Sequence, residues 1–177
     1  TYAVTADDLE RWRDLDHDFA RRPTGGGILR HGADLAFGVV LPARGSDPPS
    51  ATAVIARVAA AVRDALRAFA IETVAAGVAV RAPSHCFAGP VGAELLYRGE
   101  KILGLAARRV RGAVLVQGSL AVDRDVVMDR RVLGEGARTD LAGTAFEQER
   151  FAVLLREELL AGQVPPAAPG GGIRGRS

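Results

Sequence analysis

The chain has 177 residues, of which 48% are apolar and 25% charged, with a formal net charge of +2. This size and composition predict one globular domain, which buries roughly 70% of its unfolded surface on folding. The small net charge disfavours a nucleic-acid partner, and no apolar run reaches the roughly 20 residues of a membrane-spanning helix. Because the first residues also lack the basic start and apolar centre of a signal peptide, we expect a cytoplasmic protein with no membrane partner.

The first part of the chain predicts strands around a glycine-rich stretch, followed by a long helix. Residues 1–18 are polar and are typical of a short helix or an irregular entry segment. Segments 18–23 and 28–31, on either side of the glycines, predict short strands, and 34–42 predicts a buried strand ended by a proline. A helix capped by Ser50 or Thr52 is expected over 51–72, because apolar residues recur there at helical spacing, namely Val54, Val58, Val62, Leu66 and Phe69.

The second part predicts an antiparallel meander and one more helix. Segment 75–83 predicts a strand, and turn signals at 98–100 and 111–112 divide the run after it into strands. Segment 145–162 predicts an amphipathic helix with Gly162 as its C-cap and with inward Phe146, Phe151, Leu154, Leu155 and Leu159. We expect residues 163–177, rich in Pro and Gly, to form a disordered tail after a domain over 1–162. The fold class is therefore α+β, a mostly antiparallel sheet flanked by helices.

Three features of the sequence can carry chemistry. The glycines Gly25, Gly26 and Gly27 have neither dinucleotide-binding nor Walker spacing, so they form either a hairpin turn or a backbone surface for a ligand. The single cysteine, Cys86, is either a small core residue or a reactive thiol, and no Cys/His spacing indicates a metal site. Lys101 is the only lysine among 23 basic residues, so it is either a chance survivor or a position that needs an ammonium group.

Two motifs resemble those of the biotin/lipoate protein ligase catalytic domain family. That family shows Arg-Arg-x-x-Gly-Gly followed by a histidine, and later a Gly-x-Lys-Ile/Val-x-Gly turn. The matching residues in this chain are Arg21, Arg22, Gly25, Gly26, His31, Gly99, Lys101, Ile102 and Gly104. The similarity runs from about Asp18 to about Leu160 and implies a fold like that of class II aminoacyl-tRNA synthetases and biotin synthetase.

The segment from Cys86 to Gly104 is most similar to the cysteine-dependent octanoyltransferases within this family. The resemblance implies that Cys86 takes an octanoyl or lipoyl group from acyl carrier protein as a thioester, without a cofactor. A lysine of a lipoyl domain of a 2-oxoacid dehydrogenase, or of the glycine-cleavage H protein, then receives the group. Lys101 is expected to lower the pKa of the thiol, because a nearby cation favours a thiolate.

The resemblance assigns substrate binding to Arg22, Gly25, Gly26, Gly27, His31 and Gly104, although His31 as a structural histidine is an equal alternative. Other functions stay open: an ATP- and Mg²⁺-dependent lipoate ligase acting through lipoyl-AMP, biotin as the ligand, or a non-catalytic relative that binds an acylated carrier. The chain also departs from the family pattern. It has a shorter segment ahead of Arg21 than family members usually carry, so the N-terminal part of the domain is expected to be missing, and Leu105 and Gln117 replace a serine and a histidine.

Overall fold

The computed structural model describes residues 5–13, 15, 18–24, 28–42, 49–76, 94–133 and 139–161. Its largest element is a three-stranded antiparallel sheet in the order β1-β6-β5, formed by β1 (Asp34–Pro42), β6 (Ala113–Ala121) and β5 (Leu103–Val110). A small antiparallel sheet, in the order β2-β3-β4, consists of β2 (Val74–Ala75), β3 (Leu95–Tyr97) and β4 (Glu100–Lys101). Among the described site residues, Lys101 lies on β4 and Gly104 on β5.

The turn between β3 and β4 has the geometry that a two-residue hairpin requires. Its central residues, Arg98 and Gly99, both have positive φ angles, 53° and 80°. Positive φ at both positions matches the right-handed twist of the flanking strands, and glycine adopts it without steric cost. The turn therefore fixes the register in which Lys101 pairs with Leu96.

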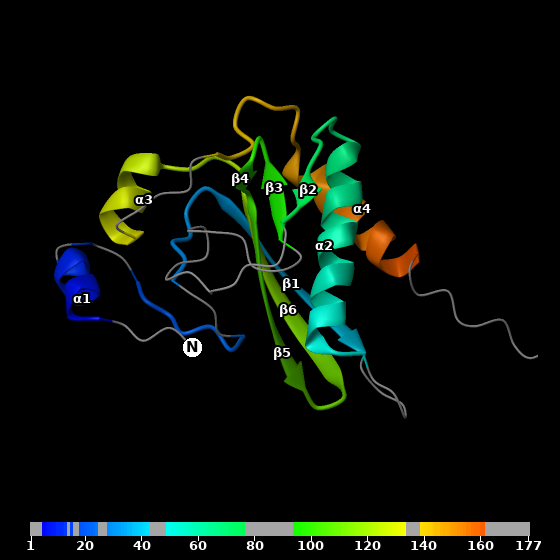
Figure 1. Ribbon diagram of the computed structural model, residues 1–177, viewed down its shortest axis with the longest axis horizontal. Coiled ribbons are helices and arrows are strands. Elements are labelled where there is room, and N and C mark those ends of the chain that lie inside the picture. Colours follow the sequence, from blue (N-terminus) through cyan, green and yellow to red (C-terminus); the bar gives the residue numbers. More distant parts are fainter. Residues whose placement is uncertain are drawn as a thin grey trace, which may run out of the picture.

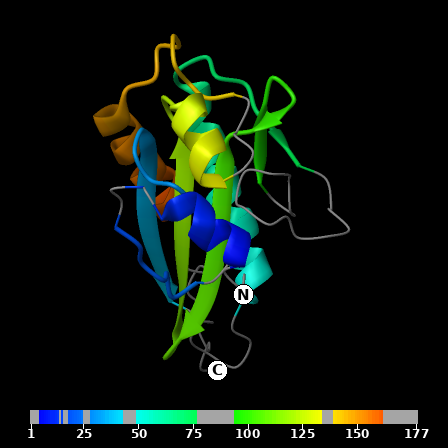
Figure 2. The same cartoon turned by 90° about the vertical axis from the view of Figure 1, so that its left-hand side faces the viewer.

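The helices lie on two sides of the main sheet. Figure 1 shows α2 (Ala51–Arg67) and α4 (Gln148–Ala161) on one side, and α1 (Ala6–Trp12) and α3 (Val126–Leu133) on the other. Figure 2, viewed from the side of α1 and α3, shows these two helices in front of the strands. In the described part of the chain, no helix is both long and apolar enough to cross a membrane.

Two hydrophobic clusters hold this arrangement together. The main core lies between the sheet and α2, where Val58, Val62 and Leu66 are fully buried, and α4 adds Phe151. A smaller cluster of Trp12, Val132 and Leu133 joins α1 to α3, with Ile28 packed against it. We call this second group the satellite cluster.

The structure confirms most of the elements expected from the sequence. Each expected helix is present, α2 is capped by Ser50 rather than Thr52, and the meander turns lie where they were predicted. Two bounds differ: α2 ends at Arg67 rather than at residue 72, since Ala70 has a positive φ of 56° that no right-handed helix contains, and α4 begins at Gln148 rather than at residue 145. The strand over 34–42 has the predicted bounds but lies at the sheet edge, so its residues are half-buried or exposed, Leu41 excepted. Helices combined with two antiparallel sheets agree with the expected α+β class.

Other expectations were wrong or lie outside the described ranges. Segments 18–23 and 28–31 form no regular strands, and Ile28 makes only an isolated bridge, because packing on the satellite cluster replaces sheet pairing there. Helix α3 was not expected. Most of the strand proposed over 75–83, the C-cap Gly162 and the tail over 163–177 lie outside the described residues.

Candidate functional site

Lys101 lies buried at the end of β4 and forms an ion pair with Glu94. Only 5% of Lys101 is exposed, and its Nζ lies 2.6 Å from Oε2 of Glu94, which is also buried. The other carboxylate oxygen, Oε1, accepts a hydrogen bond of 3.4 Å from the backbone N–H of Leu105. A buried charge is tolerated when a partner and further hydrogen bonds compensate its lost hydration. Glu94 therefore holds the lysine of the Gly-x-Lys turn against the start of β5.

A second group of polar residues lies on the sheet face that points away from α2. Side chains alternate along a strand, so the buried Val116 and Leu120 of β6 face the main core, while Gln117 and Ser119 face the opposite side. Gly104 shares that side, because it pairs with Ser119 in the antiparallel register. We call this side the outer face.

The residue before the glycine stretch is attached to the outer face. The hydroxyl of Thr24 donates a hydrogen bond of 2.8 Å to Oε1 of Gln117. One residue earlier, the carbonyl of Pro23 accepts a bond of 3.4 Å from Nη1 of Arg108 on β5. The entry to the glycines is thus tied to both β5 and β6.

The residues after the glycine stretch are attached to the same face through Asp34. His31 Nδ1 lies 2.9 Å from Oδ2 of Asp34, and that oxygen also accepts a bond of 2.5 Å from the hydroxyl of Ser119. The other oxygen, Oδ1, accepts a bond of 3.1 Å from the backbone N–H of Gly32. Burial raises the pKa of Asp34, but the hydrogen bonds from Ser119 and Gly32 and the proximity of His31 outweigh it, so the pKa is lower than the usual 3.8.

The structure brings together only part of the site expected from the sequence. His31 is linked through Asp34 to Ser119, the strand partner of Gly104. Lys101 is linked through Glu94 to the backbone of Leu105, and Arg22 is half-buried just ahead of Thr24. Cys86 and the glycines Gly25, Gly26 and Gly27 lie outside the described residues.

The two sequence departures within the sheet have different positions. Gln117 lies on the outer face and bonds to Thr24, so it belongs to the site. Leu105 packs against the main core, because its strand position faces α2.

Sequence reasoning missed the carboxylates that hold the site, Glu94 and Asp34, and the hydroxyl of Ser119. The available signal was an acidic residue immediately before an apolar strand, which is the position of Glu94 ahead of β3 and of Asp34 at the start of β1. An acid at that point is easily taken for a solvent-exposed strand end.

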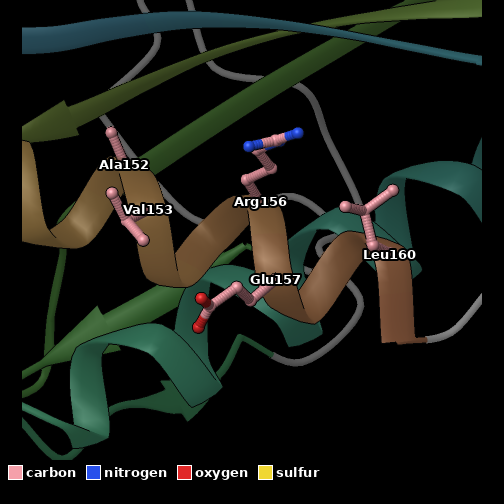
Figure 3. A pocket seen from close by; sticks show the side chains of 5 residues that line it. All are labelled: Ala152, Val153, Arg156, Glu157 and Leu160. Atoms are coloured by element: carbon pink, nitrogen blue, oxygen red, sulfur yellow. The ribbon is translucent and has the colours of Figure 1, made fainter.

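A hollow of about 350 Å³ lies elsewhere, on α4, which packs against α2. Figure 3 shows the side chains that line it, Ala152, Val153, Arg156, Glu157 and Leu160. None of the site residues named above lines this hollow. Within the described ranges, no three His, Cys, Asp or Glu side chains are grouped so as to hold a metal ion.

Comparison with known proteins identifies one family whose model spans both sequence motifs. Residues 3–155 match the model of the lipoyl protein ligase A/B catalytic domain. The chain belongs to this family. Among curated proteins it is similar to the octanoyltransferase LipM of Kyrpidia tusciae, with 29% identity in an alignment that covers 90% of this chain and 69% of that protein. Six further LipM proteins are covered over only 42 to 58% of their length, so the chain spans about half of most of these relatives.

Solved structures in the lipoyl family share its fold. Protein Ta0514 of T. acidophilum with bound lipoic acid has a TM-score of 0.71 at 24% identity, over 86% of this chain and 61% of that one. The bi-partite lipoate protein ligase of Thermoplasma acidophilum, studied with its E2 lipoyl domain, has a TM-score of 0.64 at 21% identity, over 90% and 64%. Biotin protein ligase of Aquifex aeolicus is more distant, with a TM-score of 0.54 at 13% identity, over 87% and 65%.

Proposed function

We propose that this protein transfers an octanoyl or lipoyl group to a lysine side chain of a lipoyl domain. The observation that carries the proposal is the buried ion pair between Lys101 and Glu94, because it keeps the lysine of the family turn in one position. The names of the LipM relatives and the lipoyl domain studied with the T. acidophilum ligase agree with this substrate class.

The proposed reaction has two acyl-transfer steps at Cys86. The thiolate attacks the carbonyl carbon of an octanoyl thioester on acyl carrier protein. A bond to Sγ forms, the bond to the carrier sulfur breaks, and the carrier leaves as a thiolate that takes up a proton. The neutral amine of the acceptor lysine then attacks the acyl-Cys86, an amide forms, and the Cys86 thiolate leaves while the amine proton passes to solvent.

The chain's own residues have distinct roles in this proposal. Lys101 supplies a fixed positive charge beside the reacting thioester, which favours the thiolate and the developing oxyanion. Glu94 holds Lys101 in place, and the outer face with Gly104 and His31 binds the substrate beside the glycine segment. The glycine-cleavage H protein is the alternative acceptor. We propose that the reaction takes place in the cytoplasm.

An ATP-dependent lipoate ligase is the second candidate. It is favoured by the fold shared with the lipoate protein ligase of T. acidophilum. Such a ligase activates free lipoate as lipoyl-AMP and does not need Cys86. The two functions therefore differ in what each one requires, a thiol or ATP.

The deciding experiment is intact-mass spectrometry of the protein mixed with octanoyl-acyl carrier protein. We expect an octanoyl adduct on Cys86 that hydroxylamine removes, and no adduct on the Cys86→Ser variant, because an alcohol has far less anion at neutral pH than a thiol. An unmodified wild-type protein that instead joins lipoate to a lipoyl domain only with ATP would establish the ligase. If the protein forms neither the adduct nor a ligated product, it is a non-catalytic protein that binds an acylated carrier.

A further inference from the structure

The ring of His31 is held through Nδ1 by a buried carboxylate, although more than half of the side chain is exposed. Nδ1 contacts the carboxylate of Asp34, whose side chain is only 4% exposed, while the His31 side chain is 59% exposed. We propose that Asp34 is a positioning residue for His31, fixing Nδ1–H as an internal donor and presenting Nε2 to the substrate as an acceptor for an N–H group. This role rests on the acyl transfer proposed above.

The hydrogen bonds that Asp34 accepts limit how its carboxylate can pair with the ring of His31. Oδ2 already accepts the hydroxyl proton of the buried Ser119, and Oδ1 accepts the N–H of Gly32. All these partners are donors, so the geometry favours an ionised carboxylate, and the lowered pKa of Asp34 agrees. A neutral imidazole beside such a carboxylate places its proton on Nδ1, and Nε2 keeps its lone pair.

The backbone that carries His31 is held from the opposite side as well. Nε of the preceding residue, Arg30, donates a bond of 2.6 Å to Oδ1 of Asp129, which is fully buried on α3. The other oxygen of Asp129 is 2.6 Å from Nε of Arg124. Two consecutive residues, Arg30 and His31, are thus tied to α3 and to the sheet.

The substrate atom expected at Nε2 is an N–H donor, since a neutral Nε2 carries no proton of its own. The proposed reaction brings two such N–H groups to the site. One is an amide of the acyl donor's prosthetic arm, and the other is the amine of the acceptor lysine. They are separated by measuring the two half-reactions independently.

The Asp34→Asn variant tests the proposal with almost no change in shape. With its Oδ1 kept on Gly32, the amide introduced at this position would turn its NH₂ toward Ser119 and His31, so Nδ1 would have to accept and the ring proton would move to Nε2. A purely structural Asp34 predicts no loss of activity beyond any loss of folding. Asp64→Asn is the matched control, because Asp64 pairs with Arg63 and Arg67 on α2, away from His31.

The first readout is the ring ¹⁵N spectrum of the full chain at a pH where His31 is neutral, with His31→Gln used to assign its signals among the three histidines. We expect Nδ1–H in the wild type and in Asp64→Asn, and Nε2–H in Asp34→Asn. This readout needs no turnover, so it remains decisive if the proposed function fails. A wild-type ring protonated on Nε2 overturns the proposal.

The second readout is the rate of each half-reaction, acylation of Cys86 by octanoyl-acyl carrier protein and release of the acyl group to a lipoyl domain. Asp34→Asn should slow at least one of them by about tenfold or more, the usual effect of removing a residue that orients a functional histidine. Slower acylation assigns the N–H group to the acyl donor, and slower release assigns it to the acceptor lysine. Unchanged rates despite a shifted tautomer overturn the positioning role. If Asp34→Asn fails to fold, Ser119→Ala replaces it, with a smaller loss expected in at least one half-reaction. Unchanged rates in both half-reactions again overturn the role.

Discussion

At the scale of single residues, Glu94 and Lys101 depend on each other because both are buried. Removing one member of a buried ion pair typically costs about 3–5 kcal/mol, because the buried charge of the other member loses a close partner. We therefore expect Glu94→Leu to lower the free energy of unfolding by about that much, and Glu94→Leu combined with Lys101→Met to lower it by clearly less. Urea denaturation of the two variants and the wild type measures both values.

The exposed pair of Arg67 and Glu72 is the control for this experiment. Its side chains are 52% and 78% exposed, and the charged atoms are 3.8 Å apart. Exposed pairs contribute about 0–1 kcal/mol, so Glu72→Gln should change stability little. If Glu94→Leu has an equally small effect, Glu94 does not compensate a buried charge.

Asp34 predicts how stability depends on acid. Because its pKa is lower in the folded protein than in the unfolded chain, its ionised form favours folding. This contribution is fully present above the unfolded value near 3.8 and disappears as the pH falls through the lower folded value. Asp34→Asn should therefore lose less stability than the wild type as the solution is taken from neutral pH to strong acid, when both are followed by urea denaturation at each pH. Parallel curves for the two proteins would contradict the lowered pKa.

At the scale of elements, the pairing of β1 with β6 depends on a glycine. Phe37 is directly opposite Gly118, and a Cβ added to Gly118 would lie 2.1 Å from Cζ of the Phe37 ring. The ring covers the glycine, so Gly118→Ala must displace it, which typically costs about 1–3 kcal/mol. Thermal and urea unfolding should show this loss, and Phe37→Leu should have a smaller effect in the Gly118→Ala background than in the wild type.

Gly38 provides the matched control on the partner strand. A Cβ at Gly38 meets no atom within 4 Å, and its backbone does not have the positive φ that favours glycine. Gly38→Ala should therefore be neutral or slightly stabilising. Equal losses for the two glycine variants would show that β-strand backbone effects, rather than the Phe37 ring, determine the result.

The elements that the sequence predicted are those whose apolar pattern matches the core they face. Helix α2 was predictable because Val54, Val58 and Val62 repeat on one side and pack on the sheet. Segments 18–23 and 28–31 were misread because Phe19 stacks on Trp12 of α1 and Ile28 joins the satellite cluster. That cluster also needs Val132 and Leu133 of α3, which is far away in the sequence.

The candidate site was predictable only where a residue type is rare or a motif is specific. Lys101 is the chain's one lysine, and the structure places it in a buried ion pair with Glu94. Its role in catalysis stays a prediction. The pairings of Thr24 with Gln117 and of Asp34 with Ser119 link segments distant in sequence. No local pattern encodes such contacts, because strand register sets which side chains meet.

At the scale of the whole molecule, the two hydrophobic clusters differ greatly in size. The main core includes much of α2, α4 and the sheet, whereas three buried residues, Trp12, Val132 and Leu133, form the centre of the satellite cluster. Local opening is easiest where few apolar contacts hold an element. We therefore expect amide hydrogen exchange in α1 and α3 at a lower free energy than in α2 and β6.

Asp129 contributes to the stability of the satellite cluster, because it is fully buried between Arg30 and Arg124. It joins α3 to the segment that carries His31. Asp129→Asn weakens both ion pairs at once, so amides of α1 and α3 should exchange at least about tenfold faster, which corresponds to about 1.4 kcal/mol. Native-state exchange measured residue by residue should leave the most protected amides of α2 much less affected. Equal acceleration in α2 would mean that the two clusters unfold as one unit. The residues on either side of the glycine segment would then be released only when the whole protein unfolds.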